Sequence, residues 1–395
     1  MNKLTTTFAA ALLSITFNAQ AGDCPSLSGQ YTIGSKDADF TTISDAVKAL
    51  ECGGISGAVD FKIQDGKYAE KISMSAINGA SAFNTVTFES ASGNNAAVTI
   101  AYASTDATVE MNGTNWVTFE NMTIDHKGGT YGSAMKVDGK ASHLAFKGIV
   151  FDGVEVARAT TNTATIQFTG TAPKTDIAIE DCEVNNGSVG IAKSGMNTET
   201  PDSKTNITGT LFFNQYETGL ALTNEDAPVI SNNVVSSLSN FKGFKAISLN
   251  HAMNTVVVSN NIVNAANGTY GIAMTDCGGK ATDMGQISNN SISVGGSSEA
   301  YGLYLSGNTD NQVLNFNRIK LNTGTQAANQ AYYKNAGSGN NVNMLNNIFY
   351  DLQTGGYTII GNTYKDYFNQ LPGQSNASLA VSANGIMIEK VSPIK

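Results

Sequence analysis

The residues best suited to chemistry are two aspartates that occupy equivalent places in consecutive repeats of the sequence. Asp125 lies four residues after Asn121, in a Thr-Ile-Asp-His segment, and Asp152 lies four residues after Gly148. Two carboxylates stacked about 5 Å apart repel each other unless they are protonated, solvated or bridged by a cation. With His126, the pair could act in acid/base catalysis. The two aspartates alone could bind Ca²⁺ through their oxygens.

A lyase reaction at this place also needs a basic residue. Lys127, Lys147 and Arg158 are near in the sequence, but none lies in a recognisable motif. The alternative interpretation is that Asp125 and Asp152 are solvent-facing polar groups in turns. The sequence requires no cofactor, and Ca²⁺ is the ion that the residues allow.

Other catalytic patterns are absent from the sequence. The three histidines, His126, His143 and His251, are too scattered to predict a zinc site. There is no Gly-x-Ser-x-Gly elbow, phosphate loop or dinucleotide fingerprint. Glu120 and Lys147 fall in one slot of successive repeats, followed by Glu180, and this alternation predicts a surface ion-pair ladder.

These residues belong to a repeat with a period near 28 residues. Five segments share an apolar-polar run that ends on an asparagine, and the steps between these asparagines are 28, 29, 27 and 30 residues: Asn233, Asn261, Asn290, Asn317 and Asn347. Upstream, Asn121 and Asn214 fill what we interpret as the same slot. Asparagine tolerates left-handed backbone angles, and stacked copies can bond one another. The seven residues therefore predict a structural asparagine ladder.

A second run in each repeat follows a Gly-Ile-Ala or Gly-Leu-Ala pattern, as at Gly190 and Gly219. Each repeat thus holds at least two short alternating strands separated by turns. A single copy would leave unpaired strand edges, whereas stacked copies pair every backbone and build one continuous core. The period predicts an all-β, right-handed parallel β-helix over residues 59–361, with roughly 10 to 11 coils at about 4.8 Å each.

Both ends of the repeat region carry capping signals. In residues 22–58, Ile43, Ala46, Val47 and Leu50 have helical spacing, Thr41 or Thr42 can cap the start, and Gly53-Gly54 ends it. We expect this helix to cover the first coil. In residues 362–395, helical spacing from Tyr364 to Leu371 predicts a short capping helix followed by a closing strand.

The N-terminal motifs resemble the opening of the pectin lyase-like superfamily. These are Asp39-Phe-Thr-Thr-Ile-Ser-Asp-Ala-Val and the Gly66-Lys-Tyr-Ala-Glu70 element that follows. The resemblance implies a secreted β-helix, and it covers nearly the whole chain after the leader. Pectate lyases of this fold carry an Ile-Asp-His element beside a calcium site, which matches Asp125 and His126.

Other enzymes of that fold are a poorer match. The two aspartate motifs of pectin methylesterases are missing. Of the polygalacturonase set, the chain has only Asn308-Thr-Asp310 and Arg318-Ile-Lys320, which lie too close together. The resemblance therefore predicts the fold more firmly than any activity.

The first 21 residues are typical of a secretory signal, with Lys3, an apolar stretch and an Ala-Gln-Ala cleavage site. Export permits a disulfide, and Cys24 and Cys52 flank the N-terminal module, so we predict that they pair. Cys182 and Cys277 are expected to be buried free thiols. No other apolar run is long enough to span a membrane.

The net charge of −9 argues against nucleic acid and anionic membranes as partners. We expect a secreted protein, extracellular or at the cell surface, with the periplasm as an alternative. The favoured function is a binding, adhesion or scaffold module for a polysaccharide or cell-surface glycan. The other hypothesis is a polysaccharide-active enzyme, with a Ca²⁺-dependent lyase as the favoured reaction. The chain has one Trp, but its 14 Tyr and 17 Phe could form aromatic platforms where they are exposed.

Overall fold

The structure is a computed structural model. The residues that it describes are 24–103, 105–160, 163–239, 241–265, 267–295, 299–322, 330–334, 341–345, 347–351, 357–360, 364–367, 380–382 and 385–388. The predicted signal segment, residues 1–21, lies outside the described residues.

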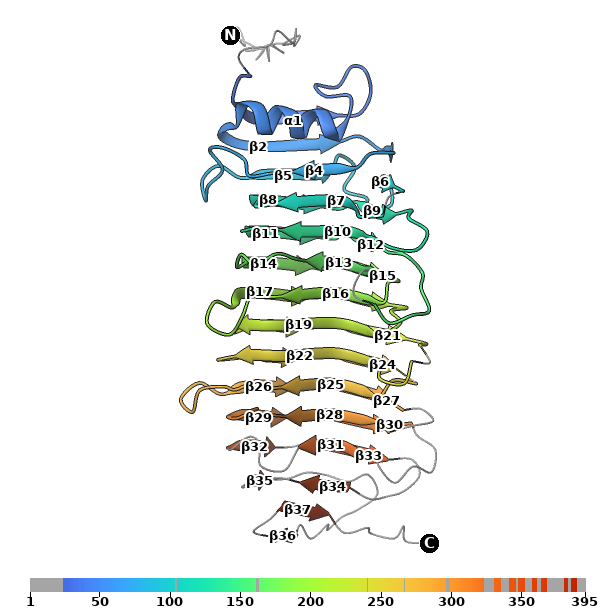
Figure 1. The fold of residues 1–395 in the computed structure, drawn as a ribbon, viewed down its shortest axis with the longest axis vertical. Helices are drawn as coiled ribbons and strands as arrows, with labels where there is room; N and C mark the ends of the chain where they lie inside the picture. Colours follow the sequence, from blue (N-terminus) through green and yellow to red (C-terminus); the bar gives the residue numbers. More distant parts are fainter. Residues whose placement is uncertain are drawn as a thin grey trace, which may run out of the picture.

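The chain forms a parallel β-helix in which each full coil contributes three strands (Figure 1). Two strands of each coil belong to a 23-stranded parallel sheet, and the third belongs to an 11-stranded parallel sheet. We call the stacks of first, second and third strands face 1, face 2 and face 3. The repeat prediction of an all-β rod with about eleven coils is confirmed.

Face 1 consists of β4 (Ile72–Met74), β7 (Ala107–Asn112), β10 (Ser133–Asp138), β13 (Ala164–Phe168), β16 (Val189–Ser194), β19 (Thr218–Asp226), β22 (Lys245–Met253), β25 (Tyr270–Thr275), β28 (Tyr301–Ser306) and β31 (Gln330–Lys334). Face 2 consists of β1 (Leu27–Ile33), β2 (Ile55–Ile63), β5 (Val86–Ser90), β8 (Asn115–Glu120), β11 (Ser142–Lys147), β14 (Thr175–Glu180), β17 (Asp202–Thr208), β20 (Val229–Ser231), β23 (Val257–Ser259), β26 (Gly285–Ser288), β29 (Gln312–Asn315), β32 (Val342–Leu345) and β35 (Tyr364–Tyr367). Face 3 consists of β3 (Gly66–Tyr68), β6 (Val98–Tyr102), β9 (Thr123–His126), β12 (Val150–Asp152), β15 (Glu183–Asn185), β18 (Leu211–Phe213), β21 (Val234–Ser237), β24 (Ile262–Ala265), β27 (Ser291–Val294), β30 (Arg318–Leu321) and β33 (Ile348–Asp351).

The core runs along the axis of the rod as stacks of like residues. Because strands pair in register, a residue that points inward in one coil lies on its equivalent in the next. On face 2, Phe61, Phe88, Phe119 and Phe146 form such a stack, with successive ring centroids 4.7, 5.1 and 6.3 Å apart. All four rings are fully buried. The apolar half of each alternating run thus fills the interior.

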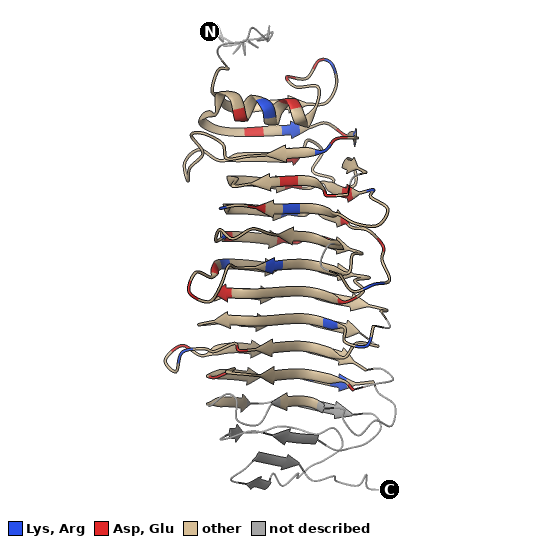
Figure 2. Cartoon of the chain, in the orientation of Figure 1, with Lys and Arg blue, Asp and Glu red and all other residues tan. Residues whose placement is uncertain are grey.

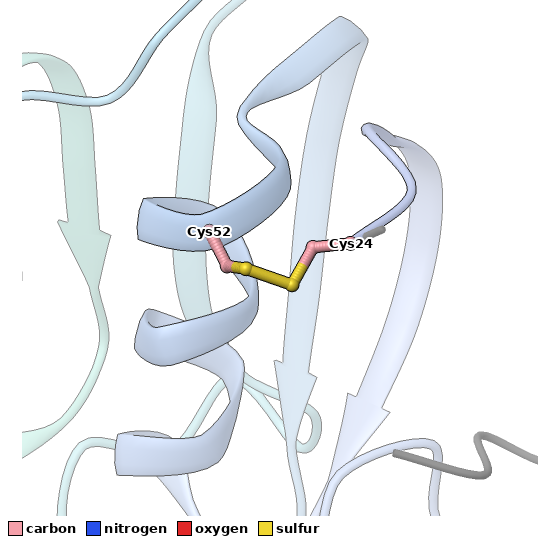
Figure 3. The surroundings of a disulfide bond; sticks show 2 residues. All are labelled: Cys24 and Cys52. Atoms are coloured by element: carbon pink, nitrogen blue, oxygen red, sulfur yellow. A yellow bond between two sulfur atoms is a disulfide. The ribbon is translucent and has the colours of Figure 1, made fainter. Parts of the chain in front are cut away.

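The N-terminal end of the rod is covered by one helix, α1 (Ile43–Gly53), as the sequence predicts (Figure 1). Thr42 caps its start by accepting a hydrogen bond from the backbone N–H of Asp45 at 3.1 Å. Gly54 ends it with a φ of 64°, which glycine adopts without strain. Cys24 and Cys52, the predicted pair, form a disulfide that ties the segment before β1 to the end of α1 (Figure 3).

The C-terminal end differs from its prediction. Residues 364–367, where we expected a capping helix, form strand β35, which pairs in parallel with β32. The strand form follows because pairing with the coil above satisfies more backbone groups than an isolated helical turn would. A small antiparallel sheet joins β34 (Tyr357–Ile360), which precedes β35, to β37 (Gly385–Ile388) and β36 (Ala380–Ser382), which follow it in the chain. Residues 368–371 of the expected helix lie outside the described residues.

The predicted asparagine ladder is present between faces 2 and 3, where it is fully buried. Each of four asparagines donates a side-chain hydrogen bond to the next at 2.9–3.0 Å, in the order Asn233, Asn261, Asn290, Asn317 and Asn347. Each also donates to a backbone carbonyl of the preceding coil. The ladder thus gives buried backbone N–H and carbonyl groups at this turn their hydrogen-bond partners.

Two residues assigned to the ladder lie elsewhere. Asn121 occupies the position before the ladder slot, with a φ of 55°, and Met122 fills the slot in that coil. Asn214 follows β18 on face 3 and donates to Asn186 at 2.8 Å. The error at Asn121 arises because the left-handed position and the ladder position are adjacent, and both are asparagine in the coils of Asn233, Asn261 and Asn290. In the coil of Asn214, the ladder position is held by Thr210, whose backbone N–H donates to Asn233.

The glycines of the second repeat motif are explained by packing. A Cβ on Gly271 would lie 2.4 Å from Ile292 Cγ2, and a Cβ on Gly302 would lie 2.2 Å from Ile319 Cγ2. At these two positions the backbone of face 1 lies so close to core side chains of face 3 that a residue with a Cβ atom would clash with them. Among the described residues, no helix is long and apolar enough to cross a membrane.

Candidate functional site

The two aspartates singled out in the sequence lie side by side on face 3. Asp125 on β9 and Asp152 on β12 are direct neighbours in the parallel register. Asp125 is 8% exposed, and its carboxylate contacts the ammonium of Lys127. That carboxylate raises the pKa of Lys127. The lysine therefore supplies the positive charge that two stacked carboxylates require.

Asp152 has a more enclosed environment than an ordinary surface carboxylate. It accepts a hydrogen bond from Asn186 Nδ2 at 2.8 Å, and Asn186 accepts one from Asn214. Burial raises the pKa of Asp152, the bond from Asn186 opposes this shift, and the charge of Asp125 adds to it. The result is a short polar chain along three coils that ends on a carboxyl group.

His126 does not join this pair as a free catalytic group. Its side chain is buried, with Nδ1 3.3 Å from Thr108 Oγ1 and Nε2 3.0 Å from the carbonyl oxygen of Tyr131. Both ring nitrogens are thus occupied, and the ring ties β9 to the loop that follows it. A catalytic role for His126 therefore stays a prediction, and it would require these two contacts to break.

The described residues do not fit a resident calcium ion well. They contain no cluster of three or more His, Cys, Asp or Glu that could hold a metal. Ca²⁺ takes six to eight oxygen ligands, whereas Asp125 and Asp152 provide two carboxylates, one of them in contact with Lys127. A calcium ion at this pair stays a prediction that needs water ligands and displacement of the lysine.

The predicted ion-pair ladder on face 2 is confirmed for one pair only, because Glu180 accepts a hydrogen bond from Asn206. Glu120, Lys147 and Glu180 are register neighbours, and Lys147 Nζ lies 3.9 Å from Glu120 Oε1. The Lys147 side chain is 48% exposed and that of Glu120 is 29% exposed, so solvent screens the pair and it contributes little stability.

A second candidate site lies on the outer side of face 1 and has a floor of small residues. Ala192, Ala221, Ser248 and Ala273 are register neighbours on successive strands. Two residues further along each strand runs a parallel row of polar side chains, which we call the hydroxyl row: Ser194, Thr223, Asn250, Thr275 and Ser306. The two rows give a smooth strip edged by hydrogen-bonding groups.

Four tyrosines stand at the C-terminal end of this strip, and we call them the tyrosine surface. Tyr304 and Tyr333 continue the small-residue row, and their rings stack with centroids 4.9 Å apart. Tyr270 and Tyr301 stack at 5.3 Å, and both meet Tyr304 edge-on at 5.1–5.2 Å. Aromatic pairs at such distances hold one another in place.

Charged groups border the tyrosine surface. Lys245 Nζ lies 5.8 Å from the centre of the Tyr270 ring, and the hydroxyl of Tyr301 donates to Glu299 at 3.1 Å. Burial raises the pKa of Tyr270, Tyr301 and Tyr304. The three phenols therefore keep their protons near neutral pH and remain hydrogen-bond donors.

Sequence reasoning missed this surface, although one signal was present. The second repeat motif carries Ala or Ser at its third position in four coils, at Ala192, Ala221, Ser248 and Ala273, and Tyr304 breaks that pattern. A large aromatic residue at an outward position is unexpected for a purely structural repeat.

A buried charged cluster inside the rod was also missed. Lys193 Nζ lies 2.6 Å from Asp202 Oδ2 and 2.6 Å from Glu225 Oε1, and Thr205 donates to Glu225 at 2.7 Å. All three charged side chains are at most 2% exposed. Since the groups satisfy one another and are closed to solvent, the cluster is part of the core.

The class of protein is now clear: the chain is a right-handed parallel β-helix protein. The family model described as "Right handed beta helix region" matches residues 107–276. Among curated proteins, no sequence matches this chain.

Solved structures with a similar backbone include enzymes and an adhesin. The GH136 lacto-N-biosidase from Eubacterium ramulus is 11% identical, with 79% of this chain and 67% of that chain covered and a TM-score of 0.49. PfbA, a surface adhesin of Streptococcus pneumoniae, is 15% identical, with 87% and 89% covered and a TM-score of 0.46. The pectin methylesterase from Aspergillus niger is 15% identical, with 92% and 93% covered and a TM-score of 0.28. At these identities and scores, the likenesses carry no argument about activity.

Proposed function

We propose that this protein is an extracellular binding module for glycans, and that the ligand lies along face 1 against the tyrosine surface. The observation that carries the proposal is the cluster of Tyr270, Tyr301, Tyr304 and Tyr333 at the end of a smooth strip with a hydroxyl row beside it.

The chemistry of the strip suits a sugar chain. A pyranose ring has an apolar face of C–H groups that packs on aromatic rings, and hydroxyls at its rim that need polar partners. The partly exposed rings of Tyr270, Tyr304 and Tyr333 supply the first kind of contact. Tyr301, which is 8% exposed, packs against these rings and holds them in place. Thr275 and Asn250 in the hydroxyl row supply the second. Because both rows repeat with the coil spacing of about 4.8 Å, they are suited to an extended polymer.

The wider properties of the chain agree with this role. A disulfide is consistent with an oxidising compartment. The net charge of −9 does not favour nucleic acid as the partner. We place the protein outside the cell or at its surface, with the periplasm as the alternative, where it would act as an adhesion or scaffold module.

The test is a binding screen of the purified chain against neutral and acidic polysaccharides by affinity electrophoresis. We expect Tyr304→Ala to weaken binding at least tenfold, about 1.4 kcal/mol or more, because it removes a central aromatic anchor. Tyr102→Ala is the matched control: Tyr102 is 38% exposed on face 3, away from the strip. Equal binding by the wild type and Tyr304→Ala would contradict the proposal.

A polysaccharide lyase is the second candidate, because the raised pKa of Asp152 beside Asp125 is a feature of acid/base sites. Lys127 would be the basic partner at the pair. The test follows ultraviolet absorbance from unsaturated ends on polyuronates, with Ca²⁺ or with a chelator. Product that disappears in Asp152→Asn would favour the enzyme, and absence of product across the panel would count against it.

A further inference from the structure

The outer side of face 3 changes in character along the rod. Its N-terminal coils carry acidic residues, Asp152 and Glu183, and its C-terminal coils carry basic residues, Arg318 and Lys320. Figure 2 shows acidic residues, together with basic ones, near β9 and β12, and basic residues at β30. The N-terminal end also holds two basic residues, Lys67 on β3 and Lys127, which contacts Asp125. The unpaired acidic charge of this face is thus that of Asp152 and Glu183, and it lies several coils from the basic residues of β30.

Between the two charged ends lies an exposed apolar patch. Leu211, Val234 and Ile262 are register neighbours on β18, β21 and β24. Leu211 is 36% exposed and Ile262 is 51% exposed, and Phe213 beside them is 46% exposed. Outward positions of a β-helix are expected to be polar, and contiguous apolar groups of this kind mark interaction surfaces.

The outward residues of face 3 follow a pattern centred on Val234. Residues at equal distances on its two sides have matching properties, apolar with apolar one coil away and acidic with basic three coils away. Counting coils from Val234 toward the N-terminus gives Leu211, Glu183 and then the coil of Asp152. Counting toward the C-terminus gives Ile262, Ser291 and then the coil of Arg318 and Lys320. Apolar residues therefore lie one coil away on both sides, and opposite charges lie three coils away, about 14 Å in each direction.

We propose that face 3 binds a second copy of this chain, with the two rods antiparallel. A two-fold axis parallel to the strands and passing in front of Val234 turns one rod onto the other. It places Leu211 against Ile262 of the other copy and Asp152 against Lys320 of the other copy. Each contact occurs twice, as a symmetric dimer interface requires.

A parallel arrangement of the two rods is disfavoured by the same charges. A two-fold axis along the rod would set Asp152 against Asp152 and Arg318 against Arg318, and like charges that meet at an interface oppose association. The antiparallel arrangement instead joins an apolar centre to two complementary charged ends. This is the usual anatomy of a specific interface, with an apolar core and a polar rim.

The first experiment is sedimentation velocity on the purified full chain, from low concentration up to about 0.1 mM, above the dissociation constants of most specific complexes. We expect a concentration-dependent dimer. Ile262→Asp should weaken it at least tenfold. Met196→Asp should leave it unchanged, since Met196 is equally exposed, at 53%, but lies in the loop after β16. A monomeric wild type, or a dimer unaffected by Ile262→Asp, would overturn the proposal.

The second experiment tests the charged ends of face 3 by reversing the sign of their charges. The variant Asp152→Lys/Glu183→Lys has two basic ends, and the variant Arg318→Glu/Lys320→Glu has two acidic ends. Each alone should be monomeric where the wild type is dimeric, but an equimolar mixture should form a heterodimer. Adding Ile262→Asp to both variants should abolish that heterodimer.

The mixing result excludes misfolding as the cause of dissociation, because misfolded chains would not re-associate in a defined pair. Variants that stay dimeric alone, or that fail to pair when mixed, would refute the antiparallel arrangement. If the wild type is monomeric and Ile262→Asp instead abolishes binding of a polysaccharide, face 3 is a glycan site and the dimer is refuted. Since the tyrosine surface lies on face 1 and the proposed dimer contact lies on face 3, each proposal can be refuted without affecting the other.

Discussion

The asparagine ladder predicts that alanine substitutions at two adjacent asparagines, Asn260 and Asn261, lower the free energy of unfolding by very different amounts. Asn261 is fully buried, and its side chain makes four hydrogen bonds. It donates to the carbonyl of Ile230 and to Asn290, and it accepts from the backbone N–H and the side chain of Asn233. Asn260, one residue earlier, is exposed and has a φ of 57°.

The cost of Asn261→Ala can be worked out from the groups that lose their partners. Asn290 Oδ1 keeps the backbone N–H of Asn261, and Asn233 Nδ2 keeps the carbonyl of Ile207. The backbone N–H of Asn233 and the carbonyl of Ile230 lose the bonds described above. At about 1–3 kcal/mol for each buried group without a partner, the loss is about 4 kcal/mol.

The assay is urea denaturation followed by circular dichroism, with the free energy of unfolding compared across three variants. We expect Asn261→Ala to lose about 4 kcal/mol, and Asn260→Ala to lose about 1–2 kcal/mol because alanine is strained at positive φ. Asn260→Gly should be close to the wild type, since glycine accepts that conformation. A loss below about 1 kcal/mol in Asn261→Ala, or equal losses at the two positions, would refute the reasoning.

Two further predictions concern the interior of the rod. Lys193→Met should cost about 3–5 kcal/mol in urea denaturation, because it leaves the carboxylates of Asp202 and Glu225 buried without their cation. Adding Asp202→Asn and Glu225→Gln should recover most of that loss, and a triple variant no more stable than the single one would contradict this. Burial raises the pKa of the Cys182 and Cys277 thiols to about 12. Neither should react with a thiol reagent at pH 8 until the chain unfolds, when two thiols per chain should be counted, and labelling of the native protein would disprove it. Since a raised thiol pKa stabilises the folded state only while the thiol is protonated, this contribution to stability should fall as the pH rises from about 9 toward 12.

Much of the fold was predictable because every coil of the β-helix is stabilised by the same kinds of interaction. The spacing of Asn233, Asn261 and Asn290 defines the coil length, and each coil buries its apolar side chains and pairs its backbone in the same way. The capping helix was equally readable, since Thr42 and the helical spacing that follows are local signals. The helical spacing that begins at Tyr364 was also a local signal, but the prediction of a helix there was wrong, because these residues pair as a strand with β32.

The candidate sites were less predictable, because they depend on which residues become neighbours across coils. The pairing of Asp125 with Asp152 followed from the repeat, but the burial of the His126 ring nitrogens did not. The Tyr270–Tyr301 stack also depends on loops of unequal length that bring the two residues into register.

The sequence by itself determined the coil, its period, five of the seven asparagines assigned to the ladder and the disulfide between Cys24 and Cys52, because each rests on positions along the chain. Only the tertiary structure decided what the outer surfaces carry. The tyrosine surface of face 1 and the apolar patch around Val234 on face 3 are made of residues from different coils. Side chains on the outside of a coil do not pack against a core, so the repeat leaves them free to vary, and the stacking register alone sets which of them meet.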